Sequence, residues 1–132
     1  MRICICMLTA ASRSQIYRYE PGQAFAPHYD DTVRVGTRHT EWTLLVYLSG
    51  EEDGVQGGET AFYPCGVAPP SDSSSGKGRK ERKIRVGEED VVVQLRKGMA
   101  LLHRHGRECL LHEGRPVYKG VKWVLRSDLV LA

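Results

Sequence analysis

The chain has 132 residues and a formal net charge of +3; 41% of its residues are hydrophobic and 27% are charged. This length allows one domain at most, and the composition is ordinary for a soluble globular chain. The longest apolar stretches, such as 43–48, are far too short to cross a bilayer, and the net charge is too small to indicate nucleic-acid binding by itself.

The first half of the chain predicts short strands separated by turns. The expected strands lie at 15–19, 24–29, 42–48 and 59–64. Glu20-Pro21-Gly22 is a turn signal after the first of them, and Pro64 stops the last. Gly57-Gly58 precedes that last strand, and we interpret this pair as a plain hairpin turn or bulge.

The second half continues the same pattern after a long polar segment. The expected strands lie at 90–95, 99–103, 109–112 and 121–131. Turns are expected at 97–98 and 104–107, and a connection at 115–120. No helical pattern of three turns or more is found, and the strands recur about every ten residues. The sequence therefore predicts an all-β or mainly β single domain over 1–132, built as a sandwich or barrel.

The segment at about 66–88 is predicted to be a disordered loop. Prolines and serines at 69–75 lead into a basic run at 77–85, which holds six Lys and Arg residues broken by Glu81. Such a run can be a nucleic-acid patch, but no aromatic residue interleaves with it. We therefore favour a solvated loop and regard nucleic acid as the less favoured partner.

The cysteines and the N-terminus favour an intracellular soluble protein, although the compartment and the oligomeric state stay open. The four cysteines are scattered, at Cys4, Cys6, Cys65 and Cys109, and there is no CxxC. This spacing indicates neither a zinc site nor a disulfide framework, so buried reduced thiols are expected. The apolar run near Met1 is shorter than the ~7–15 residues of a signal-peptide core.

His28, Asp30 and His112 are the candidate metal ligands. Residues i and i+2 of a strand point to the same face, so His28 and Asp30 can aim at one ion with Tyr29 turned away. Two imidazoles and one carboxylate are the facial ligand set of non-haem Fe(II), which leaves positions open for a cosubstrate and O2. Asp31 has the wrong alternation to replace Asp30.

Two other histidines compete with this set. His103 and His105 have the spacing of two ligands, but they abut the turn at Gly106 and have no carboxylate nearby in sequence except Glu108. We interpret them as surface residues or as residues that support the site from behind.

Lys122 is the candidate partner of a diacid. We expect the final strand to pair antiparallel with the strand of His112, which brings Lys122 close to His112. Lys122, Val124 and Arg126 share a face of that final strand. The long stem of Lys122 could then reach the far carboxylate of a five-carbon keto-diacid whose other end chelates the iron.

The sequences that flank these residues resemble the Fe(II)- and 2-oxoglutarate-dependent oxygenases, in the prolyl 4-hydroxylase-like branch. The run from Tyr17 to Asp30 is similar to the YxPGxxFxxHxD motif, and Leu45–Leu48 with 57–64 to the YLN…GGxTxF segment. Residues 97–102 are similar to the KGxALLF strand, with His103 where an aromatic usually stands. Residues 112–117 and 120–123 resemble the HxxxPVxxGxKW ending.

The resemblance implies a double-stranded β-helix (jelly-roll) core with iron in its open mouth. His28, Asp30 and His112 would bind Fe(II), and Lys122 would bind the distal carboxylate of 2-oxoglutarate. Tyr19 and Tyr47 match tyrosines that line the cosubstrate pocket in relatives, although each could equally be a packed residue with a satisfied hydroxyl. Trp42, Phe62 and Trp123 are expected in the core.

The implied activity is oxidative: a C–H bond of a peptidyl proline or another protein side chain is hydroxylated, 2-oxoglutarate and O2 are consumed, and succinate and CO2 are released. Ascorbate is an expected reductant. Relatives carry helices before the first strand, whereas about fourteen residues precede Gln15, so a truncated or poorly stable core is expected. The alternatives are a non-catalytic jelly-roll domain that binds metal or ligand, and a nucleic-acid-binding module or demethylase that uses 77–85.

Overall fold

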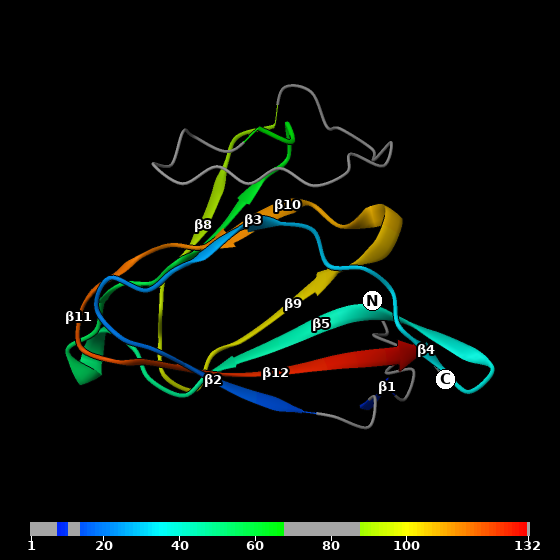
Figure 1. Cartoon of the computed structure of the whole chain (residues 1–132), viewed down its shortest axis with the longest axis horizontal. Coiled ribbons are helices and arrows are strands. Elements are labelled where there is room, and N and C mark those ends of the chain that lie inside the picture. The colour runs from blue at the N-terminus through cyan, green and yellow to red at the C-terminus, as the bar shows by residue number, and fades with distance from the viewer. Residues whose placement is uncertain (1–7, 11–13, 68–87, 132) are drawn as a thin grey trace, which may run out of the picture.

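Two antiparallel sheets face each other in the computed structural model, which describes residues 8–10, 14–67 and 88–131 (Figure 1). The larger sheet consists of β1 (Leu8–Ala10), β2 (Gln15–Tyr19), β4 (Arg34–Val35), β5 (Arg38–Tyr47), β9 (Ala100–Arg104) and β12 (Lys122–Leu131). The smaller sheet consists of β3 (Phe25–His28), β7 (Thr60–Tyr63), β8 (Val91–Val93) and β10 (Leu111–Gly114). A short ribbon pairs β6 (Gln56–Gly57) with β11 (Val117–Lys119).

Strand pairing determines which residues face the space between the sheets. β12 lies beside β5 along most of its length; β1 and β2 pair with its other edge, and β9 pairs with β5. The smaller sheet has the order β3-β10-β7-β8, which places β10 between β3 and β7. Two 3-10 turns, η1 (Glu51–Asp53) and η2 (Gly106–Glu108), are the helical elements in the described ranges.

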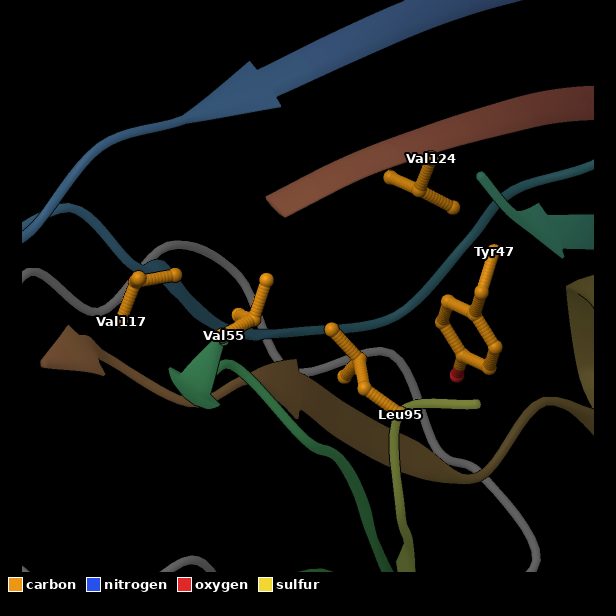
Figure 2. Close-up of a cluster of buried hydrophobic side chains, with 5 residues drawn as sticks. All are labelled: Tyr47, Val55, Leu95, Val117 and Val124. Carbon is orange, nitrogen blue, oxygen red and sulfur yellow. The ribbon is translucent and has the colours of Figure 1, made fainter. Parts of the chain in front are cut away.

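A cluster of buried side chains lies at the end of the two sheets where the β6–β11 ribbon runs (Figure 2). Its members are Tyr47, Val55, Leu95, Val117 and Val124, each at most 5% exposed. Fully burying a Val or Leu side chain contributes roughly 1.5–3 kcal/mol, so this cluster stabilises the contact between strands and loops that are distant in sequence.

This architecture confirms the predicted mainly β, jelly-roll fold class. Each of the eight expected strands overlaps an observed one, while β1, β4, β6 and β11 were not predicted. Most of the expected disordered loop, residues 68–87, lies outside the described residues, and so does the basic run at 77–85. No helix in the ranges that the structure describes is long and apolar enough to cross a membrane.

The strand of His112 begins two residues later than predicted, at Leu111 and not at Cys109. The backbone N–H of Cys109 donates to the carbonyl of Gly106 at 3.2 Å and closes η2. This N–H therefore cannot donate to a neighbouring strand. β10 therefore starts at Leu111. The expected connection at 115–120 also contains a strand, β11.

The predicted pairing of the final strand with the strand of His112 was wrong. Both edges of β10 already have partners, β3 and β7, so no edge is open to β12. β12 lies in the opposite sheet, and Lys122 approaches β10 across the space between the sheets.

Trp123 was also misplaced by the sequence-based prediction. Lys122 and Val124 are buried on the inner face of β12, so the strand's alternation turns Trp123 outward, where it is 40% exposed. The guanidinium of Arg18 lies 5.6 Å from the centre of its ring. Phe62, at 6% exposed, is in the core as expected, and Trp42 is half-buried.

Candidate active site

Three residues that the sequence singled out converge at the smaller sheet. The register pairs His28 of β3 directly with His112 of β10, and their ring centres are 4.3 Å apart. Asp30 follows two residues after His28 and turns its carboxylate between the two rings. Nε2 of His28 lies 3.5 Å from Oδ1 of Asp30, and Nε2 of His112 lies 3.6 Å from Oδ2.

Hydrogen bonds fix which nitrogen of each ring carries the proton. Nδ1 of His28 lies 2.8 Å from the carbonyl of Ala26, and Nδ1 of His112 lies 2.9 Å from the carbonyl of Leu110. A carbonyl can only accept, so both Nδ1 atoms donate, and the Nε2 atoms are the ones that face the Asp30 carboxylate. This is the arrangement of histidines that ligate metals through one nitrogen and are oriented by backbone through the other.

The electrostatics of the cluster suit a cation. Burial raises the pKa of Asp30, but the contacts with His28, Arg126, His112 and Thr43 lower it more, so the carboxyl is ionised with a pKa well below its usual value. Burial, with repulsion from His28 and His103, lowers the pKa of His112 to about 3, so this ring is neutral at physiological pH. A neutral imidazole and a carboxylate are the protonation states that a metal ligand needs.

The larger sheet holds the Asp30 carboxylate from behind. Thr43 Oγ1 donates to Oδ2 at 2.9 Å, and Arg126 Nη2 lies 3.1 Å from Oδ1. Arg126 was not among the site residues predicted from the sequence. It lies on the same face of its strand as Lys122, and this alternation could have predicted its position in the site. Thr43 had no such signal, because its contact with Asp30 depends on how the sheets face each other.

The donor atoms of His28, Asp30 and His112 all lie within 4.8 Å of one another. All three side chains line one pocket, and two of the three are buried. This donor set of two imidazoles and a carboxylate fits a ferrous ion with open coordination positions.

Lys122 is buried in the same pocket, at 4% exposed. Its Nζ donates to the carbonyl of Gly58 at 2.6 Å and lies 5.3 Å from the ring centre of Tyr19 and 5.8 Å from that of Tyr47. Burial lowers the pKa of Lys122 to about 8, although Glu59 opposes the shift. A buried ammonium with one carbonyl acceptor and two aromatic neighbours is suited to an anionic ligand.

The two tyrosines occupy different positions around Lys122. Tyr19 lines the pocket, and its register partner on β12 is Lys122 itself. Tyr47 is fully buried, and its hydroxyl is 2.7 Å from Thr60 Oγ1, so it packs behind the lysine as part of the buried cluster. Gly57-Gly58, which the sequence suggested as a plain turn or bulge, also supplies the carbonyl that binds Lys122.

The pocket lies between the sheets and draws on both. It is lined by Tyr17, Tyr19, Phe25, His28, Asp30, Thr43, Leu45, Thr60, His103, His112, Glu113, Gly114, Lys122, Val124 and Arg126. One pocket therefore contains the candidate ligands, the candidate diacid partner and an apolar wall.

His103 and His105 are not surface residues. β9 pairs with β5, which places His103 opposite Thr43; His103 lines the pocket, and its Nε2 is 3.8 Å from Oδ2 of Asp30. His105 is 4% exposed, with Nδ1 3.1 Å from Thr43 Oγ1. The prediction that they are surface residues was wrong. The carboxylate near His103 is that of Asp30, from a segment far away in the sequence, and sequence spacing does not reveal such a contact. Asp31 is exposed, as its alternation predicts.

Cys109 confirms the expectation of a buried thiol. Its Sγ accepts the backbone N–H of Asp30 at 3.3 Å and lies 3.8 Å from Nδ1 of His112. Cys65 is half-buried, and Cys4 and Cys6 lie outside the described residues.

Solved structures with a similar fold agree with this architecture. A viral collagen prolyl hydroxylase from Paramecium Bursaria Chlorella virus-1, solved as a 2OG complex, superposes with a TM-score of 0.54 at 24% identity and covers 92% of this chain and 62% of that one. A truncated form of the same viral enzyme gives a TM-score of 0.60 at 23% identity and covers 98% and 60%.

Sequence comparison leads to the family. Two Arabidopsis thaliana proteins, a probable prolyl 4-hydroxylase 3 and prolyl 4-hydroxylase 5, are 36% and 35% identical over 121 aligned residues, and each match covers 83% of this chain. The match covers 39% and 38% of those relatives, so the chain spans about two fifths of their length. The profile of the 2OG-Fe(II) oxygenase superfamily matches residues 14–127, and the chain therefore belongs to that superfamily.

Proposed function

We propose that this chain is an Fe(II)- and 2-oxoglutarate-dependent dioxygenase that hydroxylates a C–H bond of a peptidyl proline or another protein side chain and releases succinate and CO2. The observation that carries the proposal is the convergence of His28, Asp30 and His112 in one pocket with the buried Lys122. The names of the Arabidopsis relatives support the prolyl substrate class.

His28, Asp30 and His112 would hold Fe(II), which when bound supplies the redox chemistry that activates O2. The protein contributes geometry: Ala26 and Leu110 orient the two rings through their carbonyls, and Thr43 and Arg126 hold the carboxylate. No separate general base is needed. Ascorbate is the proposed reductant that keeps the iron ferrous.

Lys122 would bind the distal carboxylate of 2-oxoglutarate while the keto-acid end faces the metal ligands. The ammonium lies close to β10: a Cβ built on Gly114 would be 3.7 Å from Nζ, and Gly114 is two residues from His112. Tyr19 would line the cosubstrate from the adjacent strand, and Tyr47 would support the lysine stem rather than touch the ligand.

The apolar side of the pocket suits a proline ring. Phe25 is 45% exposed and packs edge-on against His28, with ring centres 4.0 Å apart. Tyr17 is 36% exposed and lines the same pocket. These two exposed aromatic side chains of the pocket lining offer an uncharged contact area to an extended peptide.

The test is an anaerobic titration with Fe(II) and 2-oxoglutarate, in which a weak visible metal-to-ligand charge-transfer band is expected. Admitting O2 with proline-containing peptides should then form succinate and hydroxylated peptide. A band without any decarboxylation would favour the non-catalytic binding domain, and the absence of a band would overturn the proposal. Retention on nucleic acid that weakens steeply with salt would favour the module that uses 77–85.

Gly58→Ala is expected to weaken 2-oxoglutarate binding about tenfold. An added Cβ would lie 3.1 Å from Cδ of Lys122, so the lysine stem has to move. The backbone at Gly58 has φ +77°, and left-handed strain costs on the order of 1–3 kcal/mol. Isothermal titration of the Fe(II)-loaded protein measures the affinity.

Gly98→Ala is the matched control for this variant. Gly98 has φ +80° but nothing within 4 Å of its Cβ position, so alanine imposes the strain without touching Lys122. It should lose stability and keep its affinity. Equal losses of affinity in both variants would contradict a specific role for the Gly58–Lys122 contact.

A further inference from the structure

His105 lies where the chain leaves the larger sheet for the smaller one. It directly follows β9 and precedes η2, and it is 4% exposed. Its backbone N–H donates to the carbonyl of Glu41 on β5 at 3.0 Å, which continues the β5–β9 ladder by one residue. The next N–H, that of Gly106, donates to the backbone carbonyl of Asp30 at 2.8 Å. The backbone therefore ties His105 to the strand of Thr43 and, through its neighbour, to a candidate metal ligand.

The side chain of His105 ends a chain of two hydrogen bonds that starts at the Asp30 carboxylate. An ionised carboxylate can only accept, so Thr43 donates its one hydroxyl hydrogen to Oδ2 of Asp30 at 2.9 Å. Nδ1 of His105 lies 3.1 Å from the same hydroxyl oxygen. Since the hydroxyl hydrogen is already used, Nδ1 has to supply the hydrogen of this second bond. The direction of both bonds is thus fixed: His105 donates to Thr43, and Thr43 donates to Asp30.

The other ring nitrogen of His105, Nε2, is buried and has no hydrogen-bond partner among the described residues. If Nε2 carried the ring hydrogen, it would be a buried donor without an acceptor, and Nδ1 would face the Thr43 oxygen as a second acceptor. With the hydrogen on Nδ1, the Nε2 lone pair is the one unpaired position of the ring. An unpaired buried polar atom calls for an explanation, and the bond from Nδ1 to Thr43 supplies it.

We propose that His105 is a positioning residue of the metal site, which acts through Thr43 to fix the orientation of the Asp30 carboxylate. This inference rests on the proposed function, because it needs Asp30 as a ligand of the ion. A hydroxyl that accepts a hydrogen bond is polarised and donates more strongly, so His105 strengthens the bond from Thr43 to Oδ2. Arg126 holds the other oxygen, Oδ1, at 3.1 Å. Each carboxylate oxygen is therefore oriented by its own donor.

A double-mutant cycle on Mn²⁺ affinity tests this inference without turnover. Free Mn²⁺ is followed by electron paramagnetic resonance, with Mn²⁺ as a stand-in for Fe(II). Thr43→Val removes the hydroxyl and should lower the affinity about tenfold or more, since partners that orient a metal ligand typically contribute 10–100-fold. His105→Leu should lower it about fivefold to tenfold in the wild type and leave it unchanged in the Thr43→Val background. His39→Leu is the control, because His39 is an exposed histidine on β5.

The possible outcomes separate this inference from the proposed function. Equal losses from His105→Leu in both backgrounds, or no loss in either, would overturn the role of His105 and leave the three-residue site intact. No Mn²⁺ binding by the wild type would overturn both.

Two further measurements cover the case in which His105→Leu does not fold. His105→Asn should keep most of the Mn²⁺ affinity, because the side-chain amide of asparagine can place an N–H near the position of Nδ1. Nitrogen-15 NMR of the His105 ring in the wild type should show the hydrogen on Nδ1. A neutral ring with its hydrogen on Nε2 would overturn the inference, because His105 could then not donate to Thr43.

Discussion

Replacing His28 with alanine is expected to abolish iron-dependent succinate formation. The change removes the Nε2 nitrogen that lies 3.5 Å from the Asp30 carboxylate. One of the three candidate ligands of the ion is then missing. His112→Ala should have the same effect from the neighbouring strand. Loss of a residue that merely orients a ligand typically costs 10–100-fold in metal affinity or activity, so loss of a ligand should exceed roughly a hundredfold.

The measurement is succinate formation with Fe(II) added in excess, together with Fe(II) affinity under anaerobic conditions. His39→Ala controls for the loss of an imidazole on the same protein, and circular dichroism establishes that each variant keeps its β structure. Full turnover by His28→Ala with added iron would mean that the metal lies elsewhere.

The sequence was sufficient for the local parts of this site. Alternation along a strand places His28 and Asp30 on one side, and in the structure both side chains do reach the same pocket. The same rule places Lys122, Val124 and Arg126 on one face of β12, and all three line the pocket. Strand positions followed from short apolar runs bounded by Gly and Pro, because those signals are local.

The non-local parts could not be read from spacing. Lys122 reaches the pocket from the sheet opposite β10, and this depends on β3 and β7 having filled both edges of β10. For the same reason, the sequence did not place His103 in the pocket. Its carboxylate neighbour is Asp30, which is 73 residues away in sequence. A strand pairs with whichever neighbouring strand has an open edge, on the side where the sheet's apolar face can be buried. The residues of one strand alone do not reveal which neighbour that is.

Lys122→Met is expected to weaken 2-oxoglutarate binding strongly and to stabilise the fold. Methionine keeps the length of the stem but removes the charge that would meet the distal carboxylate. Breaking a buried ion pair by removing one partner costs about 3–5 kcal/mol, which corresponds to a loss of roughly a hundredfold or more in affinity. Calorimetric titration of the Fe(II) protein measures this, with Lys119→Met, an exposed lysine on β11, as the control.

The stability gain follows from the pKa of the lysine. Burial lowers the pKa of Lys122 from 10.5 to about 8, so the folded state holds the ammonium less favourably than the unfolded chain does. Below pH 8 both states are protonated and the folded state carries the whole cost, about 3 kcal/mol at 1.36 kcal/mol per pKa unit. Losing the hydrogen bond to Gly58 offsets about 1–3 kcal/mol of that, so the free energy of unfolding at pH 7 should rise by about 1 kcal/mol.

The pH dependence gives an independent check with a definite sign. Between about pH 8 and 10.5 the unfolded wild type binds a proton that the folded form has released, so the wild type should gain stability as the pH rises through this window. Lys122→Met should lack that rise. In the wild type, 2-oxoglutarate affinity should fall about tenfold per pH unit above pH 8, because the ammonium needed for binding is lost. If Lys122→Met bound 2-oxoglutarate as tightly as the wild type, another cation of the pocket, with Arg126 first, would have to hold the distal carboxylate.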